Sequence, residues 1–156
     1  MENLKFDFVF LGQSVLKYQV PLDIFGTINQ IYEQNFHNLA PANGQLVGKI
    51  ENEHSLFYHG QDQTKMKNHN MLPTNVTNYF MTVFKHYLAF NKIRDYETHL
   101  NSVWVNEMKQ HEYNPAHVHR GMLFTGLSSV MILKLPSTYG KEYSAEHIQQ
   151  NGRLQI

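Results

Sequence analysis

A histidine pair between two strand-like segments is the feature that most constrains the fold of this chain. His117 and His119 stand two residues apart, just after the turn-forming dipeptide Asn114-Pro115. Apolar, strand-like runs lie on either side, at residues 100–108 and 127–135. Alternate side chains of an extended chain point to the same face, so both imidazoles would project into one space. The pattern predicts a β-rich fold that presents a metal site at the edge of a strand.

The absence of cysteine limits what such a metal site can contain. A chain without cysteine has no disulfides, no thiolate zinc site and no cysteine nucleophile. Nitrogen and oxygen ligands suit iron, manganese or zinc. A catalytic site normally has a third protein ligand, and the spacing leaves four candidates open: His147, Glu112, His111 and Glu146.

Charge and length narrow the classes of function further. Thirteen basic residues balance thirteen acidic residues, so we expect neither nucleic acid nor an anionic membrane as a partner. Since no apolar run approaches the roughly 20 residues that span a bilayer, we expect a cytoplasmic protein. A chain of 156 residues with 42% hydrophobic residues predicts a single domain with a substantial core.

Two helices are predicted from apolar side chains that recur at helical spacing. The first begins at Pro21 and ends near Asn38. The second is capped by Thr74 or Asn75, and its aromatic stripe spans residues 76–88. Such a stripe predicts a helix that packs against a sheet.

Several strands are expected around these helices. Residues 5–11 and 15–20 are predicted strands, whereas residues 39–70 are poorly patterned. In the strand at residues 100–108, Trp104 and Asn106 share one face. The run at 127–135 is apolar nearly throughout, which predicts a strand covered on both faces.

Three segments together resemble a known family. They are residues 102–106 (SVWVN), residues 113–121 (YNPAHVHRG) and residues 128–136 (SSVMILKLP). They are similar to the Fe(II)/2-oxoglutarate-dependent oxygenases of phages and bacteria, relatives of the prolyl 4-hydroxylases. The family pattern runs W-x-N, a polar loop, H-x-H, a short spacer, then a hydrophobic strand that ends at proline.

The resemblance implies a fold and a division of the chain. The family fold is a double-stranded β-helix (a cupin-like jelly roll) with two supporting helices, of the α+β or mainly β class. Residues 1–98 would supply the N-terminal strands and helices, and residues 99–156 the first part of the jelly-roll core. The core would be incomplete at its C-terminal end.

The resemblance also implies a function, cofactors and site residues. The chain would be an oxygenase that hydroxylates a peptide or small molecule with Fe(II) and 2-oxoglutarate. His117 and His119 would hold the metal, and Trp104, Asn106 and Met131 would line the cofactor pocket. No residue is assigned a direct catalytic role.

The sequence departs from the family pattern in three places. His119 stands where most of the wider superfamily has a carboxylate, Ser129 where a glycine is expected, and Met131-Ile132 where the family has two tyrosines. The family's distal histidine and carboxylate-binding basic residue would follow Ile156. We therefore expect either a truncated copy or a longer protein.

Two other functions stay open. One is a non-catalytic jelly-roll relative, such as a phage structural or binding protein, with its C-terminal sheet edge covered by another subunit or a partner. The other is a cupin-like zinc or manganese hydrolase or isomerase, with which the His-x-His pair is equally compatible.

Overall fold

Within the described residues, the sheet and the two α-helices lie in one of two compact units. The computed structural model describes residues 14–43, 48–59, 70–115, 117 and 126–137. One unit is Met1–His119 and the other is Arg120–Ile156. All helices and strands of the described residues belong to the first unit, which therefore carries the fold described below.

Both predicted helices are confirmed. Helix α1 spans Leu22–Asn35 and continues as the short 3-10 helix η1, Phe36–Asn38. Helix α2 spans Thr74–Phe90. The residue before each helix is a proline with an extended backbone, and neither helix begins with a side-chain capping bond. The predicted cap by Thr74 or Asn75 is therefore wrong.

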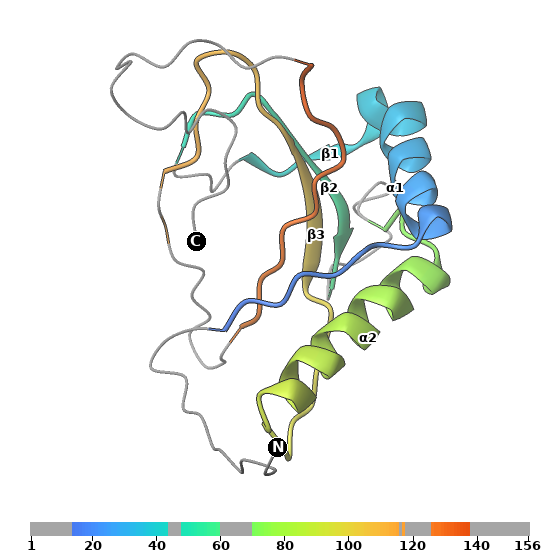
Figure 1. Cartoon of the computed structure of the whole chain (residues 1–156). Helices are drawn as coiled ribbons and strands as arrows, with labels where there is room; N and C mark the ends of the chain where they lie inside the picture. The colour runs from blue at the N-terminus through green and yellow to red at the C-terminus, as the bar shows by residue number, and fades with distance from the viewer. Residues whose placement is uncertain (1–13, 44–47, 60–69, 116, 118–125, 138–156) are drawn as a thin grey trace. The chain divides into compact units, whose positions relative to one another are not determined.

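A three-stranded antiparallel sheet packs beside the helices, which lie together on one side of it (Figure 1). Strand β2 (Asn52–Tyr58) is central, between the short β1 (Ala40–Pro41) and β3 (Ser102–Glu107). The chain is thus a mixed α/β protein. The predicted strand at 100–108 is confirmed with narrower bounds, and the central strand comes from the stretch that sequence patterning described poorly.

The core forms where the helices meet the sheet. Its buried apolar side chains come from both helices, from β2 and from the segments beside them. They are Ile24, Ile28, Leu39, Ile50, Leu56, Leu72, Val76 and Leu88. Leu56 and Val76 are completely buried. The helical stripes predicted from the sequence therefore do face the core.

Two predicted strands do not form. Residues 14–20 are not a strand, and residues 126–137 contain no strand either. In the latter segment Val130, Ile132 and Leu135 are exposed, so the prediction of a strand covered on both faces is wrong. An apolar run favours a strand, but a strand also needs a neighbour that accepts and donates its backbone hydrogen bonds. The predicted strand at 5–11 lies outside the described residues.

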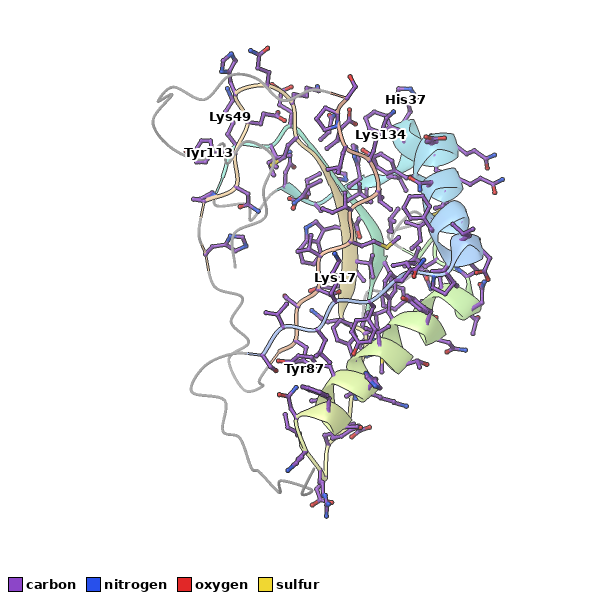
Figure 2. All side chains as sticks on the ribbon, viewed as in Figure 1. Lys17, His37, Lys49, Tyr87, Tyr113 and Lys134 are labelled. Carbon is purple, nitrogen blue, oxygen red and sulfur yellow. The ribbon has the colours of Figure 1, made fainter. Side chains whose placement is uncertain are left out.

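Instead of forming a strand, the segment at 14–20 is tied to α2 by hydrogen bonds. The Ser14 hydroxyl donates to Asn91 Oδ1 at 2.7 Å, and the Tyr87 hydroxyl donates to the Ser14 carbonyl at 2.9 Å. Tyr87 projects from the C-terminal half of α2 (Figure 2). These bonds join residues more than 70 positions apart in the sequence.

Replacing Tyr87 by phenylalanine should lower the free energy of unfolding by about 0.5–1.5 kcal/mol. The ring would stay in place, but the Ser14 carbonyl would lose its donor. Urea denaturation measures the change. The same substitution at the exposed Tyr96 is the control and should have little effect; equal losses at both positions would contradict a role for the Tyr87 hydroxyl.

None of the helices within the described residues is both long enough and apolar enough to cross a membrane.

Candidate functional site

Strands β2 and β3 present two chemically different faces. Glu53 pairs with Asn106, and Ser55 pairs with Trp104, so these four side chains share one face. Glu107 lies on the other face, where it accepts a hydrogen bond from the Tyr32 hydroxyl of α1 at 3.2 Å. The helices therefore pack on the Glu107 face. Trp104 and Asn106, both predicted cofactor-binding residues, lie on the opposite face.

The face with Trp104 holds a buried carboxyl group that sequence reasoning missed. Glu53 is 5% exposed and Ser55 is 6% exposed, whereas Trp104 is 38% exposed. Burial raises the pKa of Glu53, because it removes water from the charged form. The face therefore combines a desolvated carboxyl, a cross-strand amide and an accessible indole. Glu53 lies opposite Asn106 because β2 pairs with β3, and no local sequence pattern indicates that pairing.

Replacing Glu53 by glutamine should stabilise the protein at neutral pH. A carboxyl whose folded-state pKa is raised favours folding in its protonated form. That contribution is present below the ordinary pKa and is lost as the pH rises through the folded-state value. The gain from glutamine should therefore be largest at neutral pH and shrink in acid.

Urea denaturation at several pH values measures this effect, with the exposed Glu33→Gln as the matched control. A loss of stability in Glu53→Gln at neutral pH would show that the charged carboxylate is stabilised by its surroundings.

His54 lies on the helix-facing side of β2. Its ring lies against Phe36 with centroids 4.8 Å apart and against Tyr32 at 6.2 Å. Nδ1 is buried and, within the part of the chain that the structure describes, has no hydrogen-bond partner. Burial lowers the pKa of His54, which favours a neutral ring. His54 is therefore part of the aromatic contact between α1 and the sheet.

The segment that leads to the histidine pair forms two backbone hydrogen bonds with Lys49, which lies just before β2. Both bonds are made by Tyr113. Its backbone N–H donates to the Lys49 carbonyl at 3.1 Å, and the Lys49 N–H donates to the Tyr113 carbonyl at 2.9 Å. The two residues lie side by side in Figure 2. The antiparallel pairing of β2 with β3 thus resumes beyond the loop at 108–112.

Glu112 holds that loop in shape. One carboxylate oxygen accepts a hydrogen bond from the Lys109 N–H at 2.6 Å, and the other accepts one from the Glu51 N–H at 2.9 Å. These backbone hydrogen bonds lower the pKa of Glu112. Glu112 was a candidate third metal ligand, but both of its carboxylate oxygens already accept backbone hydrogen bonds that hold the loop. His111, another candidate, is exposed and has a left-handed backbone, with φ of 70°.

Gly48 allows the segment after Tyr113 to approach closely. A Cβ at this position would lie 2.8 Å from Pro115 Cδ and 2.9 Å from Asn114 Cα, and closer still to the Tyr113 carbonyl oxygen. Two of those contacts are with backbone atoms, which cannot rotate away. Glycine is therefore required here by the close passage of the segment that precedes His117.

Replacing Gly48 by alanine should cost about 1–3 kcal/mol of stability, as overpacking does, and should weaken metal binding by displacing residues 113–115. Urea denaturation and Mn²⁺ titration measure the two effects. Gly26→Ala is the matched control: nothing lies within 4 Å of its Cβ position in α1. That substitution should instead stabilise the helix by about 0.5–1 kcal/mol. A neutral Gly48→Ala would contradict the close approach.

His117 is exposed, and a hydrogen bond to a nearby carbonyl orients its ring. Nδ1 lies 2.8 Å from the Pro115 carbonyl oxygen. A carbonyl only accepts, so Nδ1 carries the proton and, in the neutral ring, the lone pair is on Nε2. Metal-binding histidines commonly donate their second N–H to a backbone carbonyl in this way.

The remaining predicted site residues lie outside the described residues or in the second unit. His119 lies outside the described residues, as do His147 and Glu146. Met131 is half-buried in residues 126–137, which belong to the second unit. Within the described residues, no group of three or more His, Asp or Glu side chains is arranged to hold a metal ion.

Comparisons of the chain with protein-family models, with curated proteins and with solved structures find no match.

Proposed function

We propose that this chain is a metal-binding domain of the Fe(II)/2-oxoglutarate-dependent oxygenase class, with His117 and His119 as metal ligands. The observation that carries the proposal is the hydrogen bond between His117 Nδ1 and the Pro115 carbonyl. It fixes the neutral ring in a tautomer that can bind a metal, with the lone pair on Nε2. An accessible histidine with no such bond would be free to adopt either tautomer.

The loop around the ligands supports the proposal because it is braced at several points. The Lys49–Tyr113 pairing, the Glu112 carboxylate and the close contact at Gly48 all act on residues 108–115. A metal site requires ligands that are held by a rigid scaffold while an open side stays accessible. Bracing just before an exposed histidine meets both requirements.

The polar face of the sheet supports a substrate or co-substrate pocket. Glu53, Asn106 and Trp104 supply a carboxyl group, an amide and an aromatic surface on the side of the sheet away from the helices. In the jelly-roll fold that we propose for the complete domain, this would be the inner face. A peptide or small molecule would be oriented there by hydrogen bonds and by stacking on the indole.

The cofactors would supply the oxidising chemistry, since bound Fe(II) with 2-oxoglutarate activates dioxygen for hydroxylation. The chain's own residues would bind and orient. His117 would donate its Nε2 lone pair, and the Pro115 carbonyl would keep Nδ1 protonated. The imidazole of His119, in place of a carboxylate, would make the site more positive by one charge.

A second candidate function is a non-catalytic jelly-roll relative that acts as a structural or binding protein. The observation that favours it is the exposure of Val130, Ile132 and Leu135, which are 64%, 52% and 58% exposed. Apolar side chains gathered in one segment often mark an interaction surface. A partner subunit or a second copy of the chain would cover them.

Anaerobic addition of Fe(II) and then 2-oxoglutarate tests the first function. An oxygenase should develop a visible charge-transfer absorption that requires both additions and is lost in His117→Ala. The structural alternative predicts no such band, together with an oligomer or complex that forms equally well without metal. A band of full intensity in His117→Ala would overturn the assignment of that ligand.

A further inference from the structure

A second pair of histidines lies at the end of the sheet where β2 stops and β3 begins. His59 directly follows β2, and its backbone N–H donates to the Asn101 carbonyl at 2.7 Å. His99 precedes β3 by three residues. The two rings lie with centroids 5.5 Å apart and planes inclined by 22°. Strand pairing thus brings together two imidazoles that are 40 positions apart in the sequence.

From this geometry, we propose that His59 and His99 form a surface site for a divalent transition metal such as Zn²⁺, separate from His117 and His119. Each imidazole would give one nitrogen, and water would complete the coordination. Zinc–nitrogen bonds of ~2.0–2.1 Å in tetrahedral geometry place two ring centroids about 5 Å apart. The observed separation of 5.5 Å matches this distance, and the two nearly parallel rings, inclined by 22°, would rotate so that both lone pairs aim at one ion.

Glu97 would support the site from outside the metal's ligand shell. Its Oε1 lies 3.5 Å from His99 Nε2. A carboxylate facing that nitrogen favours the proton there, which leaves the lone pair on Nδ1 for a metal. The side chain of His99 is 60% exposed, and His59 is exposed as well, so both rings can rotate to aim their nitrogens.

Metal binding at this pair would link the residue that follows β2 to the segment that precedes β3. The metal would bind the folded chain through two residues that are far apart when the chain is unfolded. It would therefore raise the melting temperature, by an amount that grows with the metal concentration relative to its dissociation constant. Two imidazoles with oxygen ligands suit zinc, nickel and copper better than magnesium or calcium.

Isothermal calorimetry of the untagged full chain with Zn²⁺ tests the proposal. The titration is done in the His117→Ala/His119→Ala background, which removes the first proposed site. One equivalent of Zn²⁺ should bind. His59→Gln and His99→Gln should each weaken binding at least tenfold, and Glu97→Gln should weaken it severalfold.

His37→Gln, at an exposed histidine of η1, is the matched control and should bind Zn²⁺ like its parent. Thermal melting provides the second readout: Zn²⁺ should raise the melting temperature of the parent but not of the His59 variant. Absence of stoichiometric binding in the parent would overturn the proposal, as would unchanged affinity in both His59→Gln and His99→Gln.

Discussion

Replacing His117 by alanine should lower the affinity of the anaerobic protein for Mn²⁺, an iron surrogate, by at least about 100-fold. The substitution removes a metal–nitrogen bond, whereas loss of an outer-shell partner alone typically costs 10–100-fold. The fold should be unaffected, because His117 is exposed and its hydrogen bond to the Pro115 carbonyl stays within the same loop. Free Mn²⁺, measured by its electron paramagnetic resonance signal, reports the affinity.

The control for this experiment is His37→Ala, which also removes an exposed imidazole. It should leave the affinity for Mn²⁺ within twofold of the original. If His117→Ala and His37→Ala bind equally well, the metal is not held by His117, and the His-x-His pair has another role.

The largest effect on stability is expected at Leu56, which is completely buried in the central strand. Leu56→Ala should lower the free energy of unfolding by about 2–5 kcal/mol, through lost apolar burial and the cavity left behind. Such a loss is a large fraction of the stability of a typical domain. The midpoint of urea denaturation measures it.

Leu22, at the first residue of α1, provides the matched control because it is 87% exposed. Leu22→Ala should change stability by less than about 0.5 kcal/mol. A comparable loss at both positions would mean that Leu56 does not lie in the core.

The helices could be predicted because their information is local. Pro21 marks where the first begins, and apolar side chains at spacings of three and four residues define the buried face of both. Ile24, Ile28, Val76 and Leu88 are buried as that spacing requires. The boundaries were right to within a few residues for the same reason.

The central strand could not be predicted because its sequence lacks the regular alternation of buried apolar and exposed polar residues. Strand β2 begins with polar residues, and two of its buried side chains, Glu53 and Ser55, are polar. Its register with β3 also shifts between Ser55 and Phe57, which breaks strict alternation. These residues form a strand because they pair with β3, and that pairing cannot be read from the sequence of β2 alone.

The opposite error occurred at residues 127–135, where an apolar run suggested a buried strand. The described residues 126–137 contain no strand, and several of their apolar side chains are exposed. The composition of a segment indicates which of its side chains could be buried, but the rest of the fold determines whether neighbouring elements cover them. The same limit applies to Met131, whose proposed role depends on those neighbours.

The candidate site was predictable in part. The sequence identified the shared face of Trp104 and Asn106, and the register confirms that they lie on the same side of β3. It did not identify Glu53 on that face, nor the use of Glu112 as a clamp for the loop, because both depend on contacts between distant segments. The metal ligands themselves remain a prediction.

Calorimetric titration of the anaerobic full chain with Mn²⁺, with and without 2-oxoglutarate, tests the central claim most directly. We predict that one equivalent binds in a manner that depends on His117, and that 2-oxoglutarate tightens binding severalfold because both bind at one centre. Stoichiometric Mn²⁺ binding that 2-oxoglutarate leaves unchanged, or no binding at all, would contradict the claim that this chain carries an oxygenase metal site.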